Sequence, residues 1–150
     1  MSRTHRLVLA IGAFAAVSLA PAAVRAQASP TASDSLAFPR QFVKWVFASQ
    51  GDSAFAHAGP ELRDGMKSAA GVNEMAQRIA TRFGELQGTD AEVQFDEGTL
   101  KVYIAVMRFS RAPQPGAWVI AYDPATRIAE RAGFSPLSNV KSKYPQAKLP

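Results

Sequence analysis

The chain has 150 residues, of which 47% are hydrophobic, and its 17 basic and 12 acidic side chains give a net charge of +5. It contains no cysteine, which excludes disulfides, thiol nucleophiles, thioether-linked haem and thiolate metal sites. Its two histidines, His5 and His57, are too few for a clustered zinc site. The sequence therefore predicts no metal and no cofactor.

The N-terminus has the three-part pattern of an export signal. A basic start precedes an uninterrupted apolar run over residues 7–20, which Pro21 ends. Small residues then predict cleavage between Ala26 and Gln27, with cleavage before Ser29 as the alternative. The apolar run is shorter than the roughly 20 residues that span a bilayer. We therefore expect an exported protein, periplasmic or secreted, that meets the membrane only through this signal peptide, 1–26.

Charge and length change once this signal is removed. The signal holds three arginines and no acid, so the mature chain carries a net charge of only +2. No arginine-rich or aromatic-interleaved patch accompanies this small excess, and we expect no nucleic-acid partner. Residues 27–35 are rich in Ser, Ala and Pro and predict a flexible leader. The rest suits one domain over 36–136, followed by a basic tail, 137–150, that we expect to be solvated and frayed.

Apolar spacings of three and four predict helices in the first half of the domain. The first begins near residues 35–36 and is stopped by Gly51. Asp52 is placed to cap a short second helix, and the Gly-Pro pair after it opens a third helical turn. A longer helix ends near Gly84. The apolar residues that mark the first and last of these helices are Phe38, Phe42, Val43, Val46 and Phe47, and Val72, Met75, Ile79, Phe83 and Leu86.

From about residue 91 the apolar residues alternate, which predicts an antiparallel meander. Strands are expected over 91–95, 100–109, 117–122 and 128–134, with the first two joined by an Asp-Glu-Gly turn. The second strand is apolar on both faces, so helices must cover one face and another subunit or the tail the other. The sequence thus predicts an α+β domain with helices packed on a four-stranded meander. One face of the second strand carries Tyr103, Ala105, Met107 and Phe109, and the other carries Leu100, Val102, Ile104 and Val106.

The order of these elements resembles the cystatin-like and nuclear-transport-factor-2-like cone folds. The stretches FVKWVFASQGDSAFAHAGPELRDGM and VIAYDPATRIAERAGF, which open and close the domain, are also similar to a small domain of unknown function in exported bacterial proteins. That domain is found alone or ahead of an α/β-hydrolase domain. The family-like features are the aromatic-rich first helix, the Gly51-Asp52 step, the Pro-Glu-Leu at 60–62, the Phe83-Gly84 pair and the turn over 123–128.

This resemblance implies an apolar pocket between the helices and a curved sheet. Cone folds of this type host isomerases, dehydratases and hydrolases, and also many members without catalysis, so the fold does not fix the function. The chain departs from the pattern at Arg127, where such hairpins usually carry glycine. The turn type of the last hairpin stays open for that reason.

Glu130 is the first catalytic candidate, because strict alternation places it on the side of Ile128, Ala132 and Phe134. If that side faces the helices, the carboxylate enters an apolar space and could act as a general base. The alternative, which we favour, is an edge-strand charge that blocks edge-to-edge association or pairs with Arg108 or Arg131.

His57 and two tyrosines are the other candidates. His57 could exchange a proton, although a histidine near a helix end is more often a structural cap. Tyr103 and Tyr122 could polarise a carbonyl, or serve as amphipathic strand residues. A serine-nucleophile elbow fails at 51–55, because Phe55 replaces the second glycine. We expect a binding surface to use Trp45, Phe55, Tyr103, Met107, Trp118 and Tyr122.

Two functions remain open. We expect an exported domain that binds a small apolar ligand or a protein partner without turnover, with a partner or a second copy docking on the Tyr103, Met107 and Phe109 face. The alternative is a small pocket enzyme of the isomerase, dehydratase or hydrolase type, using Glu130 with His57 or a tyrosine. Convergence of these groups on one void favours the enzyme, and scattered positions favour binding.

Overall fold

The computed structural model describes residues 34–150, so the expected signal over 1–26 and nearly all of the expected leader lie outside the described residues. Four helices come first, four strands follow, and two short helical segments end the chain. The elements are α1 (Ala37–Phe47), α2 (Gly51–Ala56), α3 (Pro60–Met66), α4 (Ala69–Phe83), β1 (Leu86–Glu97), β2 (Leu100–Phe109), β3 (Gly116–Asp123), β4 (Ile128–Pro136), α5 (Leu137–Lys143) and the 3₁₀ segment η1 (Pro145–Ala147).

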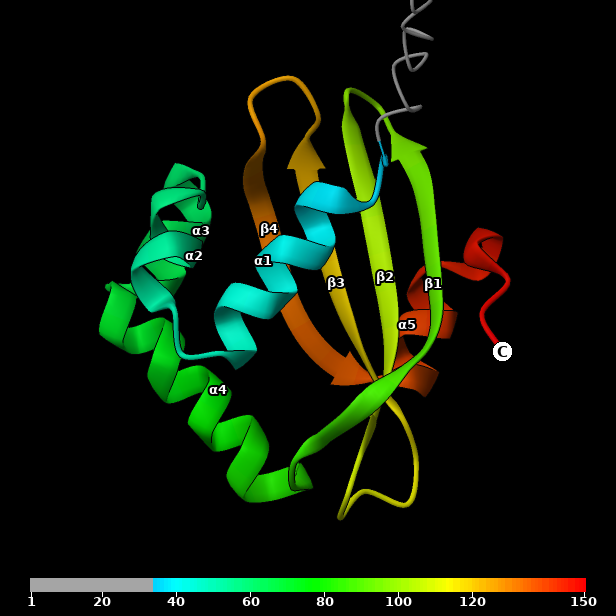
Figure 1. Cartoon of the computed structure of the whole chain (residues 1–150). Coiled ribbons are helices and arrows are strands. Elements are labelled where there is room, and N and C mark those ends of the chain that lie inside the picture. The colour runs from blue at the N-terminus through cyan, green and yellow to red at the C-terminus, as the bar shows by residue number, and fades with distance from the viewer. Residues whose placement is uncertain (1–33) are drawn as a thin grey trace, which may run out of the picture. The chain divides into compact units, whose positions relative to one another are not determined.

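The sheet is an antiparallel meander in the order β1-β2-β3-β4. Figure 1 shows α1 lying across one face of this sheet, with α2, α3 and α4 on the β4 side of it. The α5 helix lies on the other face of the sheet (Figure 1). The predicted α+β class, with helices followed by a four-stranded meander, is confirmed.

The main core lies between the helices and the inner face of the sheet. The stripe of α1 buries Phe42 and Val46 completely, as its three-and-four spacing predicts. The stripe of α4 buries Val72 and Ile79 in the same layer. Burial of these large apolar side chains removes them from water and is the main favourable term for the fold. The sheet contributes Tyr103, Ala105, Met107, Phe109, Trp118, Ile120, Tyr122 and Ala129 to this core.

The prediction that the Tyr103 face of β2 is an outer, docking face is therefore wrong. Tyr103, Ala105, Met107 and Phe109 point toward the helices and are at most 4% exposed. A strand that is apolar on both faces does not reveal which face the helices take, because alternation alone gives two equivalent assignments. The larger side chains of β2 lie under the larger helical layer, which leaves the opposite face for the C-terminus.

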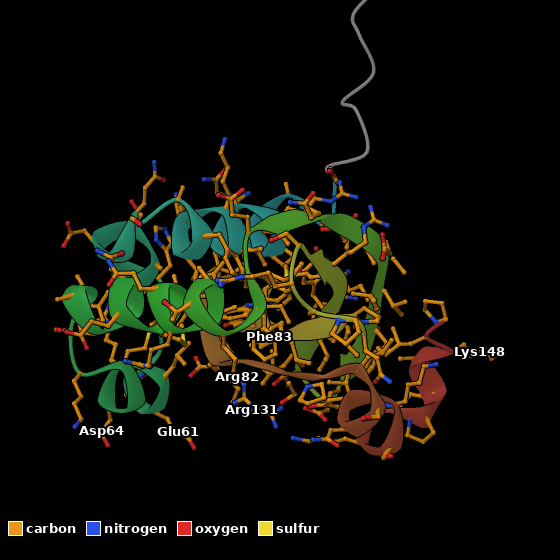
Figure 2. All side chains as sticks on the ribbon, turned by 90° about the horizontal axis from the view of Figure 1, so that it is seen from below. Glu61, Asp64, Arg82, Phe83, Arg131 and Lys148 are labelled. Atoms are coloured by element: carbon orange, nitrogen blue, oxygen red, sulfur yellow. The ribbon has the colours of Figure 1, made fainter. Side chains whose placement is uncertain are left out.

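The C-terminal tail covers that outer face and is not frayed. Val140, Tyr144 and Ala147 pack with Val102, Ile104, Ala117 and Ala121 in a second, smaller core. Leu137 precedes them at the same spacing, so the tail carries an apolar stripe of steps three, four and three. The tail lysines are exposed beside it; Figure 2 shows Lys148, which follows η1, away from Glu61 and Asp64 of α3. The sequence left two possible covers for this face, another subunit or the tail, and in the structure the tail covers it.

The first two helices meet differently from the prediction. Helix α1 ends at Phe47, and Gly51 begins α2 instead of ending α1. Gly51 is needed for close packing, because a Cβ there would lie 2.2 Å from the carbonyl oxygen of Ala69. Its N–H donates to Asn73 Oδ1 at 3.0 Å. Asp52 lies in the first turn of α2 and does not cap it, since Gln50 is the N-cap residue.

The start of the sheet also differs from the prediction. Gly84 ends α4 with a φ of +87°, as predicted, but Leu86 begins β1 and is 37% exposed instead of continuing the helical stripe. The β1 strand has 12 residues and pairs with β2 through two register shifts, one before Gly88 and one before Ala91. Such shifts bend a strand and break its alternation, which is why the first part of β1 was not visible as a strand pattern.

Candidate functional site

A cavity of about 540 Å³ opens between α1, the end of α2 and the sheet. Aromatic rings form much of its wall, and polar and charged side chains lie among them. We refer to it as the aromatic cavity. Its lining residues are Asp34, Ser35, Ala37, Phe38, Gln41, Trp45, His57, Gln94, Lys101, Tyr122, Pro124 and Arg127.

The wall of this cavity comes from one face of α1 and from two distant segments. Phe38, Gln41 and Trp45 follow one another at spacings of three and four, so α1 presents them together. The ring of His57 stacks on Trp45, with centroids 4.6 Å apart and planes inclined by 29°. Phe38 lies 5.1 Å from the Tyr122 ring and 6.2 Å from the His57 ring. Packed rings of this kind give a rigid, apolar surface against which a ligand can lie.

Among residues 34–150, one ring nitrogen of His57 has a hydrogen-bond partner and the other has none. Its Nδ1 lies 2.9 Å from the carbonyl oxygen of Ser53. Because a carbonyl oxygen only accepts, Nδ1 carries the proton, and Nε2 of the neutral ring is an acceptor. The residue also follows the last residue of α2, so the expected helix-end role is confirmed. His57 therefore closes α2 and contributes a half-buried imidazole to the cavity at the same time.

Tyr122 forms the sheet side of the cavity and anchors the chain ahead of α1. Its hydroxyl lies 2.8 Å from Gln94 Oε1 and 3.0 Å from the carbonyl oxygen of Ser35. A single hydroxyl hydrogen serves one of these acceptors at a time. Burial raises the pKa of Tyr122 above its ordinary value, so the hydroxyl stays protonated at neutral pH. It links β3 to β1 and to Ser35.

Arg127 lies at the edge of the cavity in the hairpin between β3 and β4. Its φ is +56°, in the left-handed region that glycine adopts without steric cost. Its N–H donates to the carbonyl oxygen of Asp123 at 2.9 Å. The Asp123 carboxylate accepts from the N–H of Ala125 at 2.8 Å, and this hydrogen bond, helped by Thr126, holds the pKa of Asp123 below its usual range.

Glu130 does not line the aromatic cavity. The expected alternation fails because the β3–β4 register shifts here: Tyr122 pairs with Ala129 and Ala121 with Arg131, which leaves Glu130 between the two pairs. The carboxylate lies against Gly59, where an added Cβ would be 2.2 Å from Oε2. Gly59 precedes α3, and the positive end of a helix dipole favours a negative charge at this place.

The expected pairing of Glu130 with an arginine is not found in the described residues. Arg108 pairs with Asp90 at 2.8 Å, and Arg131 pairs with Glu97. Glu130 lies on β4, the last strand of the sheet, as the favoured interpretation requires, but the edge of β4 is not open at this point. Its edge is joined to the residues before α3, where Gly59 donates to Ala129 and Ala129 to His57 at 2.7 and 2.8 Å.

Tyr103 belongs to a different depression, between α1 and β1. Its hydroxyl donates to Glu92, and Arg40 donates to both oxygens of Glu92 over 2.8–3.2 Å. Burial, reinforced by Glu92, raises the pKa of Tyr103. Arg40, against some desolvation, holds the pKa of Glu92 below its ordinary value, and the Tyr103 hydroxyl adds to this effect. The three side chains tie α1 to β1 and β2, a structural role that the sequence did not reveal.

The remaining expected binding residues lie outside the aromatic cavity. Met107 and Trp118 are fully buried in the core. Phe55 is half-buried, with the Arg63 guanidinium 5.5 Å from its ring centroid. Of the six residues expected to bind, Trp45 and Tyr122 line the cavity. Of the catalytic candidates, His57 and Tyr122 line it, and the structure does not bring them together with Glu130 or Tyr103 in one site.

Within residues 34–150, no group of three His, Asp or Glu side chains lies close enough to hold a metal ion. In the same part of the chain, no helix has the length and apolar character to cross a membrane. Comparison with family models, with curated proteins and with solved structures found no match for this chain.

Proposed function

We propose that this protein is an exported, non-catalytic binding domain that holds a small apolar or aromatic ligand in the aromatic cavity. The observation that carries the proposal is the stack of His57 on Trp45, which forms a flat aromatic wall beside Phe38 and Tyr122. A cavity with apolar walls and a few polar groups is the usual form of a small-molecule site. His57 Nε2 and the amides of Gln41 and Gln94 are polar groups that could orient a ligand.

The enzyme alternative needs Glu130 to work with His57 or a tyrosine. A general base must lie within hydrogen-bond reach of the proton that it removes, and Glu130 is not part of the cavity wall. The Tyr122 hydroxyl donates within the protein, and the Tyr103 hydroxyl donates to Glu92 in another depression. The scattered positions of these groups favour binding over turnover.

Export and family relation are part of the same proposal. The basic start, the apolar run and the small residues before Gln27 support export to the periplasm or beyond. Helices packed on a four-stranded meander, with a cavity between α1 and the sheet, suit a cystatin-like or nuclear-transport-factor-2-like cone. On these grounds we propose that the chain is related to the small exported bacterial domains of that architecture.

Native mass spectrometry of the exported protein tests the binding proposal. We expect a small-molecule adduct on the mature chain, lost in Trp45→Ala, whose folding is checked by circular dichroism. Lys44→Ala, an exposed neighbour on α1, and Glu130→Gln, outside the cavity, are matched controls that keep the adduct. A wild-type protein without adduct, or an adduct that survives in Trp45→Ala, would contradict the proposal. The same spectra give the number of subunits.

A further inference from the structure

Three charged side chains line the aromatic cavity: Asp34, Lys101 and Arg127. Two of them have an ion-pair partner, although Arg40, the partner of Asp34, also pairs with Glu92. The Asp34 carboxylate pairs with Arg40 at 2.9 Å, and the Lys101 ammonium pairs with Asp96 at 2.5 Å. The charged side chain of the cavity that remains for a ligand is therefore the third, Arg127.

Arg127 has no carboxylate partner within 4.0 Å among residues 34–150. Residues 1–33 contain no aspartate or glutamate, so no acidic side chain from that part of the chain can supply one. Arg127 is thus a cation at the cavity that the acidic side chains of its own chain leave without a partner. A guanidinium presents paired N–H donors in a plane that matches a carboxylate.

The backbone of Arg127 gives a second, independent reason to look for a use of its side chain. The residue is held at a φ of +56°, a conformation that glycine adopts without steric cost and that other residues rarely adopt. The hydrogen bond from Arg127 N–H to Asp123 and the Asp123–Ala125 contact fix the turn in this form. Unfavourable backbone conformations are concentrated at ligand sites, where the side chain is worth the cost.

We propose that the ligand is an organic anion, with an aromatic or apolar body against Trp45 and His57 and a carboxylate that binds Arg127. This inference rests on the proposed function and adds the chemical class of the ligand. A neutral ligand would leave the Arg127 guanidinium without a counter-charge at the cavity. An aromatic acid uses both the stacked wall and the cation.

A matched pair of probes separates binding in the aromatic cavity from the preference for an anion. Isothermal titration calorimetry compares 2-naphthylacetate with 2-naphthylacetamide, which have the same aromatic body and differ in charge. We expect both to bind, with the acid roughly three- to fivefold tighter, the size typical of a solvent-exposed ion pair. The preference should be lost in Arg127→Gln and kept in Arg127→Lys. It should also shrink in high salt, because screening weakens an exposed pair.

Arg131→Gln is the matched control. Arg131 lies four residues after Arg127, pairs with Glu97 and lines a separate depression beside α5. Its loss therefore changes the net charge equally without touching the aromatic cavity. Figure 2 shows its exposed side chain. We expect Arg131→Gln to keep the full preference for the acid.

The outcomes are distinct. Equal affinity of wild-type protein for acid and amide would overturn the anion inference and leave the cavity proposal standing. A preference for the acid that persists in Arg127→Gln would place the anion elsewhere and also overturn it. Failure of both probes to bind would contradict the proposed function itself. Circular dichroism of each variant confirms that the fold is intact.

Discussion

The indole of Trp45 and the imidazole of His57 stack with centroids 4.6 Å apart and planes inclined by 29°. Trp45 belongs to α1, and His57 follows the last residue of α2. The stack is therefore both a wall of the aromatic cavity and a contact between two helices. A change at either ring should affect binding and stability together.

Trp45→Ala should lower the free energy of unfolding by about 2 kcal/mol, because it removes a partly buried ring and its aromatic contacts. Trp45→Phe keeps an aromatic ring on His57 and should lose less than half of that. Urea denaturation of the two variants checks the difference. Equal losses for Ala and Phe would show that the ring contact with His57 does not stabilise the fold.

Glu92→Gln should weaken the link between α1 and the sheet. The pKa of Glu92 in the folded protein is below its ordinary value of 4.5, so the ionised form stabilises the fold above that pH, and this contribution is lost as the pH falls below it. We expect a loss of about 1 kcal/mol at pH 7, discounted for solvent exposure, and a flatter decline of stability below pH 4.5. Acid unfolding followed by circular dichroism measures both quantities.

Glu74→Gln is the control for that experiment. Glu74 forms an exposed pair with Arg78 on α4 at 3.7 Å, and such pairs contribute little. Its acid unfolding should match that of the wild type. If Glu92→Gln and Glu74→Gln behave alike, the Arg40–Glu92–Tyr103 contact does not stabilise the fold as described.

Arg127→Gly should raise the free energy of unfolding by about 0.5 kcal/mol. The substitution relieves a positive φ, and the greater freedom of glycine in the unfolded chain offsets part of that gain. Ala125→Gly, in the same turn but outside the positive-φ positions, should instead lose about 0.5 kcal/mol. Thermal unfolding of both variants measures these changes. A destabilised Arg127→Gly would mean that the arginine side chain itself stabilises the hairpin.

Tyr144→Ala should lower the free energy of unfolding by about 3 kcal/mol, because Tyr144 is 6% exposed and packs 5.7 Å from Phe95 in the outer core. Lys143→Ala, its exposed neighbour, should change stability by less than about 0.5 kcal/mol. Denaturant titration compares the two. Equal effects would indicate that the tail is only loosely attached to the sheet.

Removal of residues 137–150 extends that test to association. Without the tail, Val102, Ile104 and Ala121 lose their cover on the outer face. An uncovered apolar sheet face promotes contact between copies. We expect the truncated protein to show a larger mass than the full mature chain in light scattering, and an unchanged mass would mean that this face needs no cover.

The elements with strong periodicity could be predicted from the sequence. The stripes of α1 and α4 and the strands β2, β3 and β4 appear as regular apolar spacings, and their order gives the α+β class. The tail stripe at Leu137, Val140 and Tyr144 has the same signal, but it is short and lies among lysines. The sidedness of β2 could not be predicted, because both of its faces are apolar.

The site was only partly predictable for physical reasons. Trp45, His57 and Tyr122 stood out by residue type, and Arg127 by its departure from glycine. The Arg40–Glu92 contact joins residues that are 52 positions apart, and nothing local marks it. Glu130 was misplaced because a register shift is invisible in an alternating pattern. Contacts that depend on how distant segments align with one another cannot be predicted from local sequence patterns.

The most direct test of ligand binding in the aromatic cavity uses the chain's two indoles as reporters. Trp45 lines the cavity, whereas Trp118 is fully buried in the core, with no acceptor for its Nε1–H among residues 34–150. In ¹H–¹⁵N spectra titrated with 2-naphthylacetate, we predict that the Trp45 indole signal, assigned with Trp45→Phe, moves progressively to saturation while that of Trp118 stays nearly fixed. An unmoved Trp45 signal, or shifts confined to the outer face around Tyr144, would contradict a binding site in this cavity.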